Sequence, residues 1–225
     1  MKQPKLELLS PAGSWEALEA AVRSGADAVY LGGSLFSARA NAQNFDHDTL
    51  KQAVAYCHAR GVKVHLAVNT ILLNHEIEPA LDFVAFACTL PVDAVIVQDT
   101  GLLHLLRQAA PTLQIHASTQ MSVHTPEGAK LLAEQGVSRV VLARELSLRE
   151  IKEISLALKD GGFAHVEIEH FVHGALCMSV SGQCYFSSLL GSRSGNRGQC
   201  AQTCRLPFSA KGGTGYDLSL KDLSM

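Results

Sequence analysis

At 225 residues the chain is long enough to bury the core of one α/β barrel domain. Hydrophobic residues make up 47% and charged residues 18%, and the net charge of -2 argues against a chain that binds polyanions over its whole surface. No secretory leader opens the chain, and no apolar run approaches the roughly 18 residues that a membrane span needs. We therefore expect a protein of the reducing cytoplasm with no membrane contact, where clustered cysteines are more often metal ligands or redox groups than disulfides.

Short apolar runs alternate with amphipathic stretches along most of the chain, which is typical of repeated βα units. Strands are predicted at residues 6–10, 28–32, 63–69, 94–99, 114–119, 139–144 and 165–171. Helices are predicted between them at residues 14–24, 46–60, 76–90, 101–110, 125–135 and 147–159. The segments GADAVYLGG, PVDAVIVQD and GVSRVVLAR share one form, a turn and a polar residue before a short strand, and so support an internal repeat.

Seven such units predict a parallel sheet, and an eighth strand is plausible at residues 216–220. The predicted fold is therefore a TIM-type (β/α)8 barrel that forms one domain over residues 1–225, with a cysteine-rich insertion at about 174–215. Because the chain stops before an eighth helix, we expect a barrel truncated after strand 8, or one domain of a longer protein. The alternative is an open doubly wound sheet, but no GxGxxG follows the first strand, so a dinucleotide site has no support.

Side-chain alternation sorts the strand residues into two sets. In the run HVEIEH at residues 165–170, Val166 and Ile168 would pack under the helices. The positions that then face the barrel interior are His165, Glu167, Glu169, Gln114, His116, Ser118, Gln120, His65 and Asn69. An interior carboxylate is costly unless it is paired or hydrated. The two glutamates therefore indicate either a reactive site or a buried polar layer bonded to His65 or His116.

In a barrel, chemistry takes place at the carboxyl ends of the strands and in the loops that follow them. The predicted catalytic residues at this mouth are Glu167, Glu169, His116 and Asn69. Arg39 and Arg144 lie at or beyond strand ends and could hold an anionic group by bidentate pairing, with a surface salt bridge as the competing explanation for each. The remaining predicted substrate-binding residues are Gln120, Arg193 and Arg197.

Four of the six cysteines stand in 28 residues, with the spacing Cys-x6-Cys-x15-Cys-x3-Cys. They are Cys177, Cys184, Cys200 and Cys204, and four thiolates suit either zinc or an iron–sulfur cluster. Only the last pair is as close as a zinc knuckle, and a glycine-rich span of 15 residues is better suited to wrapping a bulkier cluster. Disulfides and a purely structural metal are the alternatives. Cys57 and Cys88 fall on helix faces among apolar residues and are predicted to be core residues.

The cysteine-rich stretch also has an unusual charge balance. Residues 170–216 contain no Asp or Glu, and the basic residues in this interval are Arg193, Arg197, Arg205 and Lys211. A cluster with four thiolates is anionic, so this balance favours a bound cluster, an anionic substrate such as RNA or a smaller molecule, or both.

These residues together resemble the U32 peptidase family, also called collagenase-like proteases. The resemblance rests on Glu169, Phe171, the run GALC ending at Cys177, the run GQC ending at Cys184, and a following Ser187. Phe186 departs from the aliphatic residue expected before that serine. The stretches NRGQCAQTCRLPF, LLSPAGSWEALEAAVRSGADAVYLGG and FSARANAQNF also look like the family, so the likeness covers nearly the whole chain.

The resemblance implies two activities. The family name implies proteolysis, with collagen as the best-known claimed substrate. Several bacterial members are instead linked to oxygen insertion, in tRNA or rRNA hydroxylation and ubiquinone synthesis, with a four-cysteine iron–sulfur cluster. By that analogy a 4Fe-4S cluster is expected on Cys177, Cys184, Cys200 and Cys204. Some members draw the fourth ligand from further downstream, which leaves Cys204 the least secure of the four.

The sequence itself favours redox chemistry over proteolysis. Residues 165–170 read HVEIEH and lack the histidine pair of HExxH, and residues 191–195 read GSRSG and lack the nucleophile of GxSxG. A nucleophile pair of Cys177 with His170 or His173 is conceivable, but it would not explain four clustered cysteines. The prediction is an iron–sulfur-dependent enzyme of RNA hydroxylation or related oxygen insertion. The alternatives are a cysteine peptidase and a non-catalytic binding module held by a four-cysteine metal site, with zinc as the alternative metal.

Overall fold

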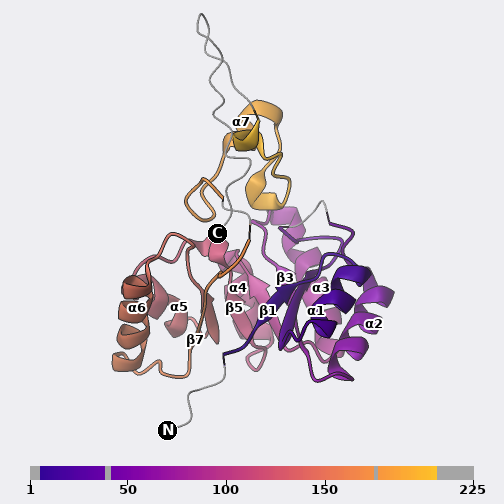
Figure 1. Ribbon diagram of the computed structural model, residues 1–225, viewed down its shortest axis with the longest axis horizontal. Coiled ribbons are helices and arrows are strands. Elements are labelled where there is room, and N and C mark those ends of the chain that lie inside the picture. The colour runs from indigo at the N-terminus through magenta and orange to yellow at the C-terminus, as the bar shows by residue number, and fades with distance from the viewer. Residues whose placement is uncertain (1–5, 39–41, 175–176, 207–225) are drawn as a thin grey trace, which may run out of the picture.

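The structure, a computed structural model, describes residues 6–38, 42–174 and 177–206. Its sheet has seven parallel strands that lie side by side in chain order and curl into a half-barrel (Figure 1). The strands are β1 (Leu9–Pro11), β2 (Ala28–Gly32), β3 (Lys63–Val68), β4 (Ala94–Val97), β5 (Ile115–Ala117), β6 (Arg139–Val141) and β7 (Glu167–Glu169). The helices that follow the first six strands are α1 (Trp15–Arg23), α2 (His47–His58), α3 (Ile77–Thr89), α4 (Thr100–Ala109), α5 (Pro126–Glu134) and α6 (Leu148–Asp160).

The predicted order of seven strands and six helices is confirmed, with most strands shorter than predicted. The sheet order runs from β1 to β7 without reversal, whereas a doubly wound sheet reverses its order near the middle, so that alternative is wrong. The predicted eighth strand at residues 216–220 lies outside the described residues. None of the helices in the described ranges has the length and apolarity that crossing a bilayer requires.

Local chemistry explains where the helices begin. The Ser14 hydroxyl accepts a hydrogen bond from the Ala17 N–H at 3.2 Å, and an Asp46 carboxylate oxygen accepts one from Thr49 at 2.8 Å. Ser147 and Glu150 bond each other's backbone N–H groups and form a capping box before α6. Each contact satisfies an N–H group that a helix start leaves unpaired, so these residues fix the helix boundaries from the sequence alone.

One hydrophobic core lies between the sheet and the helices. The strand residues on this side are aliphatic, and they pack against buried helix residues such as Leu18, Leu50 and Leu102. Cys57 lies in this core, as predicted. Cys88 does not, because Val84 and Ala87 occupy the buried positions of α3 and leave Cys88 exposed; that prediction was wrong.

The chain after β7 forms a separate lobe. Its described residues, 174 and 177–206, hold one short helix, α7 (Phe186–Gly191), and two 3-10 turns, η3 (Gly195–Arg197) and η4 (Thr203–Arg205). Figure 1 shows this lobe above the ends of the strands, with α7 near its top. We call these residues the cysteine segment. The insertion predicted at 174–215 extends beyond residue 206, and its last part lies outside the described residues.

Candidate functional site

Three polar side chains meet on the concave side of the sheet. His65 comes from β3, His116 from β5 and Glu169 from β7, and one ligand atom of each lies within 4.8 Å of the other two. The two imidazole rings contact edge to face, with centroids 4.7 Å apart. The structure therefore brings together three of the side chains that alternation predicts to face the interior.

Arg139, the first residue of β6, completes this polar interior, and the sequence analysis missed it. Its guanidinium lies 2.8 Å from Glu7 and 3.1 Å from Glu169, and it also binds Glu167. Lys63 binds Glu7 from the other side at 2.6 Å. The sequence signal was alternation, because Arg139 comes directly before Val140, which packs in the core on the helix side. The structure places Arg139 opposite both His116 and Glu167, on the other face of the sheet.

Burial sets the protonation of the two interior histidines. The His65 side chain is almost wholly buried, and desolvation, with Arg139 nearby, lowers its pKa to about 4. Desolvation and the neighbouring His65 lower the pKa of His116 to about 2. Both rings are therefore neutral near pH 7. Each ring also has a buried Nδ1 atom with no hydrogen-bond partner, which is uncommon for a buried polar atom.

The two predicted catalytic glutamates have different surroundings. Burial raises the pKa of Glu169, and this effect outweighs the opposing attraction of Arg139. The Glu167 side chain is 62% exposed, so it pairs with Arg139 at the rim of the interior rather than inside it. His165 and Gln114 precede the first residues of β7 and β5 and are exposed. Their predicted interior positions were wrong, because strand alternation does not extend to them.

Two other predicted mouth residues bond to the backbone. The Asn69 side-chain oxygen accepts a hydrogen bond from the Ala38 N–H at 2.9 Å. The Gln120 amide donates to the Asn69 carbonyl at 3.2 Å. These bonds join the loops after β2, β3 and β5, so in this structure both side chains help to shape the mouth. Arg39 lies outside the described residues.

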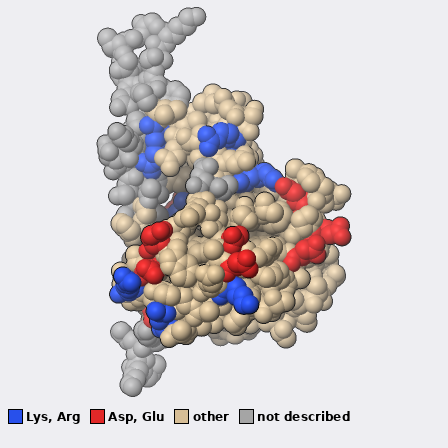
Figure 2. Space-filling view, turned by 90° about the vertical axis from the view of Figure 1, so that its right-hand side faces the viewer, with Lys and Arg blue, Asp and Glu red and all other residues tan. Residues whose placement is uncertain are grey.

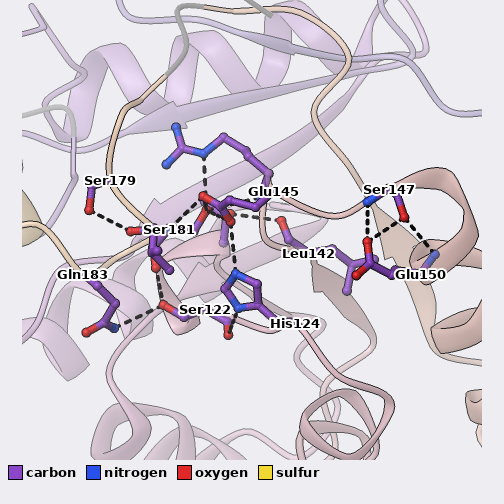
Figure 3. A network of polar contacts seen from close by, with 12 residues as sticks. Ser122, His124, Leu142, Glu145, Ser147, Glu150, Ser179, Ser181 and Gln183 are labelled. Atoms are coloured by element: carbon purple, nitrogen blue, oxygen red, sulfur yellow. Dashed lines mark hydrogen bonds and ion pairs between the residues drawn. The ribbon is translucent and has the colours of Figure 1, made fainter.

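The cysteine segment is bonded to the loops after β5 and β6 by a polar network around buried Ser181 (Figure 3). The Ser181 N–H donates to Glu145 at 3.0 Å, and the Ser181 hydroxyl accepts a bond from the Arg144 N–H at 3.3 Å. The Ser181 carbonyl accepts a hydrogen bond from Ser122. Arg144 is thus next to the segment, and its guanidinium also lies 5.7 Å from the ring centre of Phe171.

A close backbone approach requires the glycine after Ser181. Gly182 has φ +76°, and a Cβ there would lie 2.2 Å from the Gln120 carbonyl oxygen. Any larger residue would therefore push the segment off the loop after β5. The Gly182 carbonyl in turn accepts a bond from the buried Asn196 side chain, so this one glycine connects both halves of the segment to the barrel.

Arg197 connects the segment to a third loop. Its guanidinium donates to the Ile71 carbonyl at 2.7 Å and binds both carboxylate oxygens of Glu76, at the start of α3. This bidentate pair lowers the pKa of Glu76 to about 2. Arg193 is exposed and has no such contact among the described residues. Arg197 thus has a structural role here, and Arg193 is the more accessible of the two predicted substrate contacts.

The four clustered cysteines are free thiols. Burial raises the pKa of Cys204, and negative charge on Cys177 and Cys200 raises it further, so these three thiols lie close enough to repel as thiolates. Cys200 Sγ accepts a hydrogen bond from the Gln202 N–H at 3.3 Å. A metal centre would relieve the repulsion, and thiolates with N–H donors are the usual donor set of iron–sulfur clusters. The residues therefore fit such a cluster.

The spacing of these sulfur atoms bears on the kind of metal. Four thiolates around one tetrahedral zinc ion lie about 3.8 Å apart, given Zn–S bonds near 2.3 Å. Among the described side chains, His65, His116 and Glu169 form a group whose possible ligand atoms lie within 4.8 Å of one another, and no three of the four cysteines form such a group.

Surface charge differs between the lobe and the body. On the face in Figure 2, the upper part of the molecule shows Lys and Arg, and the acidic residues lie below it. This agrees with the sequence, since residues 170–216 contain no Asp or Glu. Arg193 and Arg205 belong to this lobe, and Lys211 lies outside the described residues.

The chain matches the family described as Peptidase family U32 over residues 13–225. It is 44% identical over 225 residues to "23S rRNA 5-hydroxycytidine C2501 synthase" of Escherichia coli, covering 97% of this chain and 33% of that protein. It is 37% identical to "tRNA hydroxylation protein P1" of Bacillus subtilis, covering 91% and 47%. It is 36% identical to "Collagenase" of Porphyromonas gingivalis, covering 91% and 50%. The chain thus spans a third to a half of the length of these relatives.

Solved structures share the fold at low sequence identity. One described as the U32 peptidase Mk0906 has a TM-score of 0.57 and 19% identity, covering 76% of this chain and 69% of that one. A putative lyase/mutase from Burkholderia cenocepacia has a TM-score of 0.53 and 12% identity, covering 78% and 72%. At these identities the likeness supports the α/β fold and carries no information on the reaction.

Proposed function

Because the chain belongs to peptidase family U32, we propose that it is part of an iron–sulfur-dependent enzyme that hydroxylates tRNA or rRNA. The observation that carries this proposal is the cysteine segment, with four free thiols next to the carboxyl ends of the strands. The relatives named for rRNA and tRNA hydroxylation, at 44% and 37% identity, support RNA as the substrate class. The chain covers only part of each relative, so the activity proposed is that of the whole protein.

In this proposal the cysteines would hold the cluster and the arginines would bind the RNA. Cys177, Cys184, Cys200 and Cys204 would hold the cluster, which when bound supplies electron transfer or activation of an oxygen donor. Arg193, on the acid-free lobe, would contact RNA phosphate. Arg144 lies beside the segment and would hold an anionic group at the mouth. His116 and Glu169 lie on the concave side of the sheet, and His116 is buried there.

Proteolysis is the second candidate, since one relative at 36% identity is named a collagenase. A cysteine peptidase needs a base within hydrogen-bond reach of the nucleophile. In the described part of the chain, the Cys177 thiol is not hydrogen-bonded to His170 or His173. Hydroxylation therefore has the stronger support.

The test compares one ligand cysteine with a matched cysteine elsewhere. Cells that lack the gene are complemented with the unchanged gene, with Cys177→Ser or with Cys88→Ser, whose exposed thiol lies on α3. Nucleosides from digested tRNA and rRNA are then compared by mass spectrometry. We expect a hydroxylated nucleoside that is absent without the gene, absent with Cys177→Ser and restored with Cys88→Ser. Anaerobically purified protein should contain iron and sulfide, and Cys177→Ser should lose both.

Two outcomes would contradict the proposal. One is an RNA nucleoside profile that is identical with and without the gene. The other is cleavage of gelatin by metal-free protein that Cys177→Ser abolishes, which would establish the peptidase instead.

A further inference from the structure

The interior group of His65, His116 and Glu169 has no role in the proposed cluster, and it has the composition of a metal site. Its two buried imidazoles each have a Nδ1 atom without a partner. From these residues we infer a second metal site, in which His65, His116 and Glu169 bind one divalent first-row transition-metal ion inside the sheet. It is separate from the four cysteines and does not depend on the proposed reaction.

Geometry allows one ion to contact all three side chains. Ligand atoms that sit 2.0–2.2 Å from a common ion lie about 3–4 Å apart. Here the three ligand atoms lie within 4.8 Å of one another, so side-chain movements of roughly 1 Å or less would close the site. The three come from β3, β5 and β7, which fixes their backbones in one sheet. A site on strands is held more precisely than one on loops.

Charge in the interior also favours a cation. The polar group contains three carboxylates, Glu7, Glu167 and Glu169, against two cations, Arg139 and Lys63. Glu7 pairs with both cations, and Arg139 is shared among Glu7, the exposed Glu167 and Glu169. The three charges of -1 and two of +1 leave a net -1, and Glu169 is the most buried of the three carboxylates. A cation beside it would offset a charge that is otherwise costly to bury.

The ligand types select the kind of ion. Two neutral imidazoles and one carboxylate suit iron, cobalt, nickel, copper or zinc, whereas magnesium and calcium prefer oxygen ligands alone. Three protein ligands also leave coordination positions open, as in catalytic rather than structural sites. The inferred site therefore takes a transition-metal ion with room for water or a small ligand.

The experiment uses cobalt, because its visible spectrum distinguishes thiolate from nitrogen and oxygen ligands. The parent is the full chain with Cys177, Cys184, Cys200 and Cys204 all replaced by Ser; the unchanged chain with alkylated thiols is a second parent. We expect either parent to bind one Co²⁺ ion per chain, with weak visible bands and no thiolate charge-transfer band. The ion should also raise the melting temperature.

Two substitutions locate the ion. Glu169→Gln keeps the shape and an oxygen for Arg139, and His116→Gln keeps a polar side chain. Each should weaken Co²⁺ binding by an order of magnitude or more and abolish the rise in melting temperature. His58→Gln is the matched control, because His58 pairs with Asp93 on the helix side and should leave binding unchanged. Folding of each variant is checked by circular dichroism.

Either of two results overturns the inference. A folded parent that binds neither Co²⁺ nor Zn²⁺ has no such site. Binding that is equally tight in the folded Glu169→Gln and His116→Gln variants places the ion elsewhere. The outcome of the RNA hydroxylation test is independent of both results, because the four cysteine substitutions remove the proposed cluster from the Co²⁺-binding assay.

Discussion

Two arginines, one in the sheet interior and one in the cysteine segment, bind carboxylates in contrasting ways. Arg139 has a 7% exposed side chain and is held by carboxylates at the start of the sheet and on β7. Arg197 is 33% exposed and binds Glu76, 121 residues away in the chain, across two loops. The first pairing is part of the core structure, whereas the second fastens a lobe. Breaking the first should therefore affect global stability, and breaking the second should affect only the lobe.

The largest effect is expected from Arg139→Met. It leaves Glu169 without its cation and Glu7 with Lys63 alone, and removing one partner of a buried pair costs about 3–5 kcal/mol. Glu167 is largely exposed and should contribute little. Urea unfolding at pH 7 measures the loss. Arg149→Met, at an 84% exposed surface pair, is the control and should change stability by less than about 0.5 kcal/mol. An equal effect of both substitutions would show that the interior charges are solvated.

The next effect concerns pH. The pKa values of His65 and His116 in the folded protein, about 4 and about 2, are below the value near 6.5 expected in the unfolded chain. Below pH 6.5 the unfolded state therefore binds protons that the folded state does not, and stability falls as pH falls. The slope is about 1.4 kcal/mol per pH unit for each histidine.

Glu169 has the opposite effect on the pH dependence of stability. Its raised pKa means that, as pH falls, the folded protein binds a proton at Glu169 before the unfolded chain does. The slope given for the two histidines is therefore an upper value. Unfolding free energies at pH 7, 6.5 and 5.5, with a chelator present, measure it. His116→Gln should reduce the slope between pH 6.5 and 5.5 by about half, and a slope that does not change would contradict burial as its cause.

The smallest global effect, and the most local one, is expected from Glu76→Gln. The amide still accepts the bond from the Leu73 N–H but loses the ion pair with Arg197. Because the pair is partly exposed, the loss of global stability should be about 1 kcal/mol or less. Cleavage by trypsin at Arg193 should become faster, since the lobe is held less firmly, and the substitution leaves every trypsin site intact. Glu78→Gln, exposed on the same helix, should leave the cleavage rate unchanged.

Predictions from the sequence were most accurate where local chemistry decides the structure. Apolar runs placed the seven strands, and capping residues such as Ser147 and Glu150 placed the helix starts, because these signals act within a few residues. Alternation also predicted that His65, His116 and Glu169 would share one face. Alternation failed for His165, because the strand begins later than predicted. The helix-face prediction failed for Cys88, because other residues of α3 face the core.

The sequence by itself determined the order of the βα units, the cysteine spacing and the acid-free stretch around it, because these depend on near neighbours in the chain. Only the tertiary structure decided that Arg139 pairs with Glu169, that Arg197 is bound by Glu76, and that the two histidines meet. Those contacts join residues 30 to 121 positions apart and depend on strand register and loop placement. A one-residue change in register would separate every one of the interior contacts, so no local pattern could have specified them.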